Sequence, residues 1–241
     1  MSFTCSHRRL SVAIQAILLL AAAAPCALAQ NVDVSVRVEI NRQASQASRL
    51  GSSEVVVWLT SLQKTDANAA LAKDYTLLQK DKEFVPHILV VPVGSSVDFP
   101  NLDPFFHNVF SLFNGKRFDL GLYEGHTHRT VQFDREGVSY IFCNIHPNMG
   151  AVVVSVGTPY FGLSSSDGTV ILRGVPAGRY RLNVWAENVP TDRLSQLSRV
   201  VEINPENSQL GLLRLKTSGD MMRHHQNKFG EAYKPAPRQS Y

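Results

Sequence analysis

Residues 138–156 read VSYIFCNIHPNMGAVVVSV, and this stretch carries the clearest sign of the fold. It contains two runs of β-branched and aromatic residues, Tyr140–Phe142 and Ala151–Val156, on either side of a polar loop. Such runs, bounded by residues that favour turns, are typical of β-strands. We therefore predict two strands joined by a loop that starts at Cys143.

The same strand pattern recurs through the body of the chain. Val32, Val34, Val36 and Val38 alternate with polar residues, as expected when one face of a strand is buried. Further candidate strands are 54–59, 88–93 and 131–133, with turn residues at 94–96, 114–115, 135–137 and 167–168. Only residues 68–73, with their alanines, resemble a helix. Short strands separated by frequent turns predict an all-β fold built from antiparallel sandwiches.

Two β units are expected within this body, the first spanning residues 74–157. The second contains Asp167-Gly168 and then the sequence VPAGRYRL at 175–182. This pattern resembles the late hairpin of carboxypeptidase regulatory-like, or transthyretin-like, β-sandwiches. Residues 158–216 are short for a whole sandwich of that kind, so we expect strands within 30–73 to complete it around an inserted first unit. The alternative assigns those N-terminal strands to the first unit.

The two ends of the chain are expected to lie outside the folded body. Residues 1–29 have a basic start, an apolar run at 10–24 and Ala27-Leu28-Ala29 before Gln30, which predicts a cleaved signal peptide and a periplasmic protein. A membrane anchor is the alternative, but Pro25 interrupts a run shorter than the ~20 apolar residues that span a bilayer. Residues 217–241 are polar and contain two prolines, so we predict a disordered basic tail.

Loss of the leader changes both the charge and the cysteine content. Removing Arg8 and Arg9 from the 24 basic residues leaves 22 against 20 acidic ones, so nucleic-acid binding has no electrostatic support. Cys5 and Cys26 leave with the leader, and Cys143 is then the remaining cysteine. A single thiol in an oxidising compartment is a liability unless it is buried and inert or bound to a metal.

The loop that follows the predicted strand Tyr140–Phe142 has the spacing Cys-x2-His-x2-Met, at Cys143, His146 and Met149. Thiolate, imidazole and thioether are soft ligands that select copper, whereas zinc binds thioether poorly and structural zinc sites usually use two or more cysteines. A three-ligand plane needs a second histidine from elsewhere, and His107 is the candidate. The alternative is that these side chains only fill the core.

The pattern G-x-x-V-x-F-x-N at 94–101, followed by His-Asn-Val at 107–109 and by the Cys-x2-His-x2-Met loop, resembles the cupredoxin (blue copper) family, and its loop spacing is similar to that of amicyanin. The resemblance covers roughly Phe84 to Val156. It implies a cupredoxin Greek-key β-sandwich and one type 1 copper ion, bound by four ligands: His107, Cys143, His146 and Met149.

The resemblance also implies roles for two neighbours of the ligands. Asn108 would tie the two ligand loops together through hydrogen bonds. Pro147 has no N–H and cannot donate a hydrogen bond to the Cys143 sulfur. His126 and His128 could bind a second metal, but we expect them to be solvated, and we expect His87 to be structural.

The function expected from these features is single-electron transfer, without catalysis, between the copper and a transient protein partner such as a cytochrome or a quinoprotein dehydrogenase. No stable membrane insertion is expected after signal cleavage. Two other functions stay open. One is copper carriage or storage with the same ligands, and the other is a β-sandwich interaction module with a structural copper site.

Overall fold

A computed structural model describes residues 31–41, 55–63, 72–112, 115–217 and 226–233. The predicted signal peptide lies outside these ranges. Of the predicted helix at 68–73, only residues 72 and 73 are described, and neither is helical.

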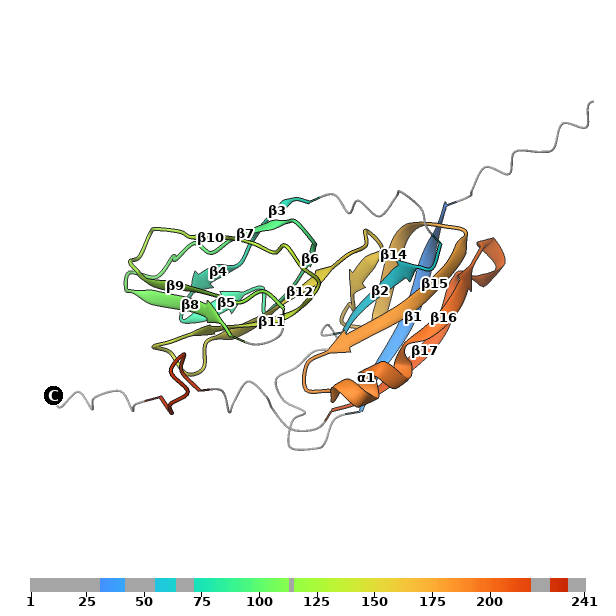
Figure 1. The fold of residues 1–241 in the computed structure, drawn as a ribbon. Helices are drawn as coiled ribbons and strands as arrows, with labels where there is room; N and C mark the ends of the chain where they lie inside the picture. Colours follow the sequence, from blue (N-terminus) through green and yellow to red (C-terminus); the bar gives the residue numbers. More distant parts are fainter. Residues whose placement is uncertain (1–30, 42–54, 64–71, 113–114, 218–225, 234–241) are drawn as a thin grey trace, which may run out of the picture.

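The first sandwich, residues 74–157, consists of strands from one continuous part of the chain (Figure 1). Its larger sheet has the order β6-β12-β11-β8-β9 and its smaller sheet the order β10-β7-β3, while β4 and β5 form a separate hairpin. The strands are β3 (Asp74–Thr76), β4 (Leu78–Lys80), β5 (Glu83–Val85), β6 (Ile88–Pro92), β7 (Ser96–Asp98), β8 (His107–Ser111), β9 (Phe118–Tyr123), β10 (Thr130–Gln132), β11 (Gly137–Cys143) and β12 (Gly150–Val156).

The second sandwich draws its strands from both sides of the first. β1 pairs with β14 and β17, and β2 pairs with β13 and β15, so residues 74–157 are inserted between β2 and β13. The two sheets have the orders β14-β1-β17 and β13-β2-β15-β16. The elements are β1 (Asn31–Asn41), β2 (Val55–Ser61), β13 (Phe161–Leu163), β14 (Thr169–Pro176), β15 (Gly178–Ala186), α1 (Thr191–Leu197), β16 (Arg199–Ile203), the 3-10 helix η3 (Pro205–Asn207) and β17 (Gln209–Lys216).

The all-β prediction is confirmed, but the late hairpin expected within residues 167–182 is wrong. β14 and β15 follow one another across a tight turn, yet β14 is hydrogen-bonded to β1 in one sheet and β15 to β2 and β16 in the other. Both strands bury alternate side chains, including Leu172 and Leu182, in the space between the two sheets. The Tyr180 hydroxyl donates a hydrogen bond to the Pro176 carbonyl across the turn, 2.9 Å away. The turn therefore connects the two layers of the sandwich.

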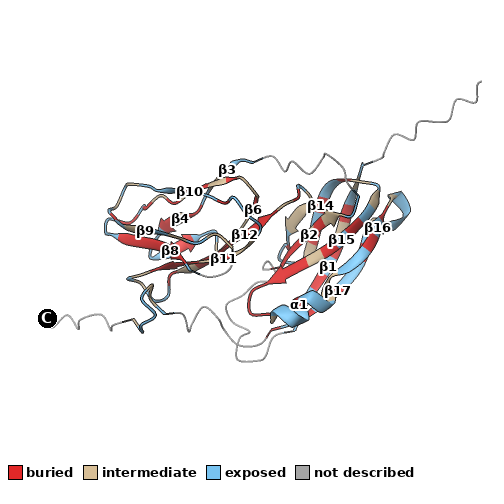
Figure 2. Ribbon diagram, in the orientation of Figure 1, coloured by how far each residue is buried: buried red, intermediate tan, exposed pale blue. Residues whose placement is uncertain are grey.

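β12 is buried on both of its faces, and this joins the two sandwiches (Figure 2). Ala151 and Val153 belong to the core of the first sandwich. Val152, Val154 and Val156 belong to the core cluster that contains the buried side chains of the second sandwich. A continuous apolar run of this kind is what a strand with two covered faces requires.

His87, which we expected to be structural, lies at this junction. Its Nε2 is 2.8 Å from Oε2 of Glu187, which follows β15, and its Nδ1 is 3.1 Å from the carbonyl of Gly150 on β12. The imidazole therefore links the first sandwich to the second.

Part of the segment predicted to be disordered has defined contacts. Residues 226–233 form a turn that lies against the first sandwich, near the end of β11. Nowhere in the described ranges does the chain form a helix long and apolar enough to cross a membrane.

We expect Val154→Ala to lower the free energy of unfolding by about 1–3 kcal/mol, because the substitution leaves a cavity between the two sandwiches. Equilibrium urea unfolding measures this change. Val200→Ala, at a position 47% exposed, is the control and should stay within about 0.5 kcal/mol of the parent. An equally small effect at Val154 would contradict the burial of this outer face.

Candidate metal centre

Two neighbouring strands bring His107 and Cys143 together. His107 is the first residue of β8 and Cys143 the last residue of β11, and Cys143 is paired with Val109. Side chains two residues apart on a strand point to the same face, as do directly paired residues on adjacent strands. His107, Val109 and Cys143 therefore share the inner face of the sheet, where all three are fully buried.

The loop from β11 to β12 supplies the remaining members. The backbone N–H of Met149 donates to the carbonyl of His146, and the N–H of Cys143 donates to the carbonyl of Met149, each over 3.1 Å. These two bonds close the loop onto itself and bring His146 back over Cys143. Met149 is fully buried in the same core cluster as Cys143.

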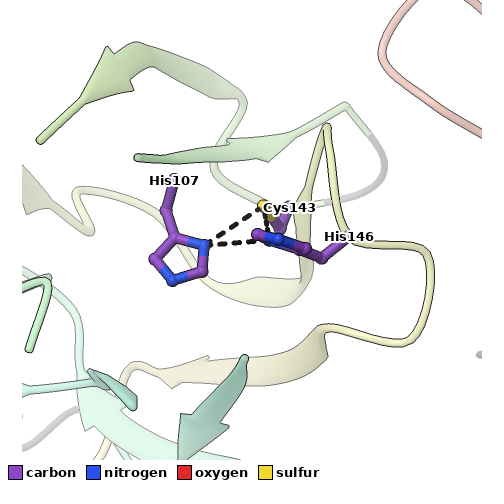
Figure 3. Close-up of side chains that lie close together, drawn as sticks. All are labelled: His107, Cys143 and His146. Carbon is purple, nitrogen blue, oxygen red and sulfur yellow. Dashed lines mark hydrogen bonds between the residues drawn. The ribbon is translucent and has the colours of Figure 1, made fainter. Parts of the chain in front are cut away.

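Three atoms that can bind a metal ion lie close together beside this loop (Figure 3). The Cys143 sulfur lies 3.7 Å from Nδ1 of His107 and 3.5 Å from Nδ1 of His146, and the two Nδ1 atoms are 3.1 Å apart. A metal with bonds of about 2.0 Å to nitrogen and about 2.3 Å to sulfur, in a trigonal plane, would have ligand separations of roughly 3.5–3.7 Å. The triangle formed by these side chains is thus close to the size that a trigonal metal requires.

Asp103 fixes the ring of His107. Its Oδ2 lies 2.8 Å from Nε2 of His107, so that nitrogen donates its hydrogen to the carboxylate, and Nδ1 is left unprotonated with its lone pair toward the cluster. The same carboxylate accepts backbone N–H bonds from Asp81 at 2.7 Å and from Lys82 at 3.0 Å. Asp81 and Lys82 have φ of 56° and 61°, and they form the tight turn between β4 and β5.

The pKa values in the site reflect its burial. Burial raises the pKa of Asp103, but the hydrogen bonds from Lys82, His107 and Asp81 outweigh it and leave that pKa below its usual value. Burial raises the pKa of the Cys143 thiol, against an opposing effect of nearby backbone N–H groups. Burial, followed by the charges of His107 and Lys82, lowers the pKa of His146. A neutral imidazole is the form that binds a metal.

His146 is the member of the cluster nearest to solvent, and it is partly exposed. Its ring lies beside that of Phe105, with centroids 5.8 Å apart, and Phe105 also contacts the ring of His107 at 5.3 Å. The Asn101 amide donates to the Phe105 carbonyl over 2.7 Å, which fixes the loop that carries this aromatic ring.

Asn108 joins the two ligand loops through its backbone. Its carbonyl accepts the N–H of Asn144 over 3.2 Å, while its side-chain amide donates to Oδ1 of Asp119 on β9, 2.7 Å away. Pro147 is exposed in the loop and, as a proline, offers no N–H to the sulfur.

The other histidines named from the sequence lie outside the cluster. His126 and His128 are exposed, and Nδ1 of His128 is 2.7 Å from Oδ1 of Asp98. Within the described ranges, His107, Cys143 and His146 are the one group of histidine, cysteine and acidic side chains placed to hold a metal ion.

Two contributors to the site were not found by sequence reasoning. Asp103 stands four residues before His107, a spacing that could have identified it as a partner for the imidazole. Tyr233 donates a hydrogen bond from its hydroxyl to the Cys143 carbonyl, 2.7 Å away. No local sequence pattern connects these two residues, which are 90 positions apart.

Comparisons with known proteins found solved structures only. No family model matches the chain, and no curated protein sequence matches it significantly. A purple cupredoxin from Nitrosopumilus maritimus is 24% identical over 34% of this chain and 100% of its own, with a TM-score of 0.32. A reduced amicyanin variant is 21% identical over 41% of this chain and 99% of its own, with a TM-score of 0.32.

A copper-containing nitrite reductase from Thermus scotoductus SA-01 is 22% identical over 34% of this chain, with a TM-score of 0.33. The match spans only 22% of the reductase chain. The purple cupredoxin and the amicyanin are thus matched over essentially their whole length, and the enzyme over a minor part.

We expect Asp103→Asn to lower the stability of the metal-free protein at neutral pH by about 1.5–3 kcal/mol, because a hydrogen bond to a charged acceptor is lost. A carboxyl whose folded pKa is depressed contributes stability above its unfolded pKa and loses it as pH falls through the folded pKa. The gap between parent and variant should therefore close below pH ~3.8. Urea unfolding across this pH range measures it, and a gap that is independent of pH would contradict the assignment.

Proposed function

We propose that this chain is a periplasmic cupredoxin that binds one type 1 copper ion and passes single electrons between protein partners. The observation that carries the proposal is the triangle formed by the buried Cys143 sulfur and two imidazole nitrogens, with sides of 3.1–3.7 Å. Met149 would be the fourth, weakly bound ligand, since its side chain is fully buried in the same hydrophobic core as Cys143.

The donor set favours copper over other common metals. One sulfur and two imidazoles are too soft for magnesium or calcium, and the described ranges contain no second cysteine to complete a structural zinc site. When bound, copper would supply a centre that gains and loses one electron. Asp103, the loop bonds of Met149 and the pairing of β8 with β11 would hold the ligands in one arrangement in both oxidation states.

The surface around His146 supports a brief encounter with a redox partner. We define the apolar rim as Leu102, Phe105, Phe106, Ile145 and Pro147, all of which are exposed and lie on the two loops that flank the metal cluster. Lys82 adds a positive charge, with its Nζ 5.4 Å from the centroid of the Phe105 ring. A small apolar patch with few charges suits a transient interface in which the exposed edge of His146 faces the partner.

The cellular setting is part of the proposal. The signal-like sequence of residues 1–29 supports export, and the lone cysteine of the remaining chain is compatible with an oxidising compartment once it binds a metal. A cytochrome or a quinoprotein dehydrogenase would be a partner of suitable chemistry. The second sandwich, with its VPAGRYRL turn, is proposed to be transthyretin-like and to serve as a support for the copper unit.

The test is to load the mature protein with Cu(II) and record its visible spectrum and a redox titration. We expect an intense blue or purple thiolate absorption and a reversible one-electron transition. Cys143→Ser should abolish the absorption, while Ser139→Ala, a change at a buried position earlier on β11, should retain it.

A colourless protein that prefers zinc would contradict the proposal. A protein that binds Cu(II) without thiolate absorption and releases it readily would instead point to copper carriage or storage.

A further inference from the structure

The C-terminal segment, residues 226–233, folds into a compact turn before it meets the first sandwich. The Asn227 N–H donates to the Glu231 carbonyl over 2.9 Å, and the Asn227 side-chain oxygen accepts the N–H groups of Phe229 and Glu231. Gly230 has φ of +77°, a conformation that glycine adopts without steric cost. Lys228 lies within this turn, and Tyr233 follows it.

One set of contacts reaches the strand end that carries the cysteine ligand. The Lys228 N–H donates to Oδ1 of Asn144 over 2.9 Å, and the Tyr233 hydroxyl donates to the carbonyl of Cys143 over 2.7 Å. Cys143 and Asn144 are consecutive residues, so the segment holds the beginning of the ligand loop at two successive points.

The other contact reaches the strand that carries the first histidine. Nζ of Lys228 is 2.7 Å from Oδ2 of Asp119, and Oδ1 of the same carboxylate accepts the side-chain amide of Asn108. Asn108 directly follows His107. The Lys228 ammonium and the Asp119 carboxylate are both partly buried, with side chains 23% and 37% exposed.

Next to the pairing of β8 with β11, one further backbone bond links these two ends, from the Asn144 N–H to the Asn108 carbonyl at 3.2 Å. The Asn108 side chain is bonded to Asp119 rather than to the cysteine loop. A chain of hydrogen bonds from Asn108 through Asp119 and Lys228 to Asn144 passes through the C-terminal segment. It reinforces the backbone bond between Asn144 and Asn108.

We propose that residues 226–233 are part of the metal centre, in which Lys228 and Tyr233 are positioning residues that hold the His107 and Cys143 ends of the ligand set at a fixed separation. This rests on the proposed copper function. The hydrogen bonds of Lys228 and Tyr233 reach the backbone carbonyl of Cys143, the side chain of Asn144 and, through Asp119, the side chain of Asn108. Its attachment restrains the ligand loop against opening, which slows the loss of a bound metal.

The experiment uses the full mature chain with two variants, Tyr233→Phe and Lys228→Met, each of which removes one contact and keeps most of the side-chain volume. Each has a matched control. Tyr180→Phe also removes a hydroxyl bond to a backbone carbonyl, and Lys116→Met also removes a lysine, 23% exposed, that pairs with an aspartate over 2.8 Å. Neither control residue is bonded to the ligand loop.

The first readout is amide hydrogen exchange at Asn144 in the metal-free protein, because this N–H bonds to the Asn108 carbonyl just beyond the paired ends of β8 and β11. We expect exchange to become about 2- to 10-fold faster in both variants, the factor given by the loss of one hydrogen bond, and to stay unchanged in both controls. The second readout is the rate at which Cu(II)-loaded protein gives up copper to a chelator, which should rise by a similar factor.

Unchanged amide exchange in both variants, or equal increases in the controls, would overturn the proposal. So would an unchanged rate of copper loss in a protein that does bind copper. If the parent binds no copper at all, the proposed function fails, and the amide exchange of the metal-free chain still reports separately whether the segment restrains the loop.

Discussion

The backbone pairing of β8 with β11 is the constraint on which the rest of the site depends. It places Cys143 opposite Val109, and therefore sets the cysteine beside His107 on the buried face of one sheet. The loop that follows has only to fold back by a few residues to bring His146 within 3.5 Å of the sulfur. Asp103 and the C-terminal segment act on residues that this pairing has already brought together.

Burial of polar and sulfur atoms in such a site has a cost that the surrounding bonds offset. His107 is fully buried, and a buried imidazole without partners would lose its hydrogen bonds to water. Its Nε2 is bonded to Asp103, and its Nδ1 faces His146 and Cys143. A carboxylate on the far nitrogen selects the tautomer that presents Nδ1 to the cluster. The arrangement leaves Nδ1 of both histidines facing the Cys143 sulfur.

Much of the fold and part of the site could be predicted from the sequence. Features set by neighbouring residues could be predicted, whereas features set by contacts between residues far apart in the sequence could not. The alternation of Val32 to Val38 and the run from Ala151 to Val156 depend on local patterning, and both lie in strands. Cys143, His146 and Met149 fall within one short loop, so their spacing carries the information directly. His107 needed a family pattern, because its approach to Cys143 depends on strand pairing over 36 positions.

The features that sequence reasoning missed depend on contacts between distant segments. Asp103 becomes useful only because the turn between β4 and β5 donates two N–H groups to its carboxylate. The VPAGRYRL turn was interpreted as a hairpin, although a turn between two strands has the same local sequence whether it stays in one sheet or connects two. Tyr233 lies in a polar segment with no periodicity, and only its bond to the Cys143 carbonyl reveals its role.

We propose that one rigid set of ligands serves both oxidation states of copper. X-ray absorption at the copper edge, recorded on the oxidised and the reduced protein, tests it most directly. We expect one sulfur and two imidazole nitrogens at short range in both spectra, with little change in their distances from the copper. Loss of an imidazole, or the gain of oxygen ligands, when the copper changes oxidation state would contradict it.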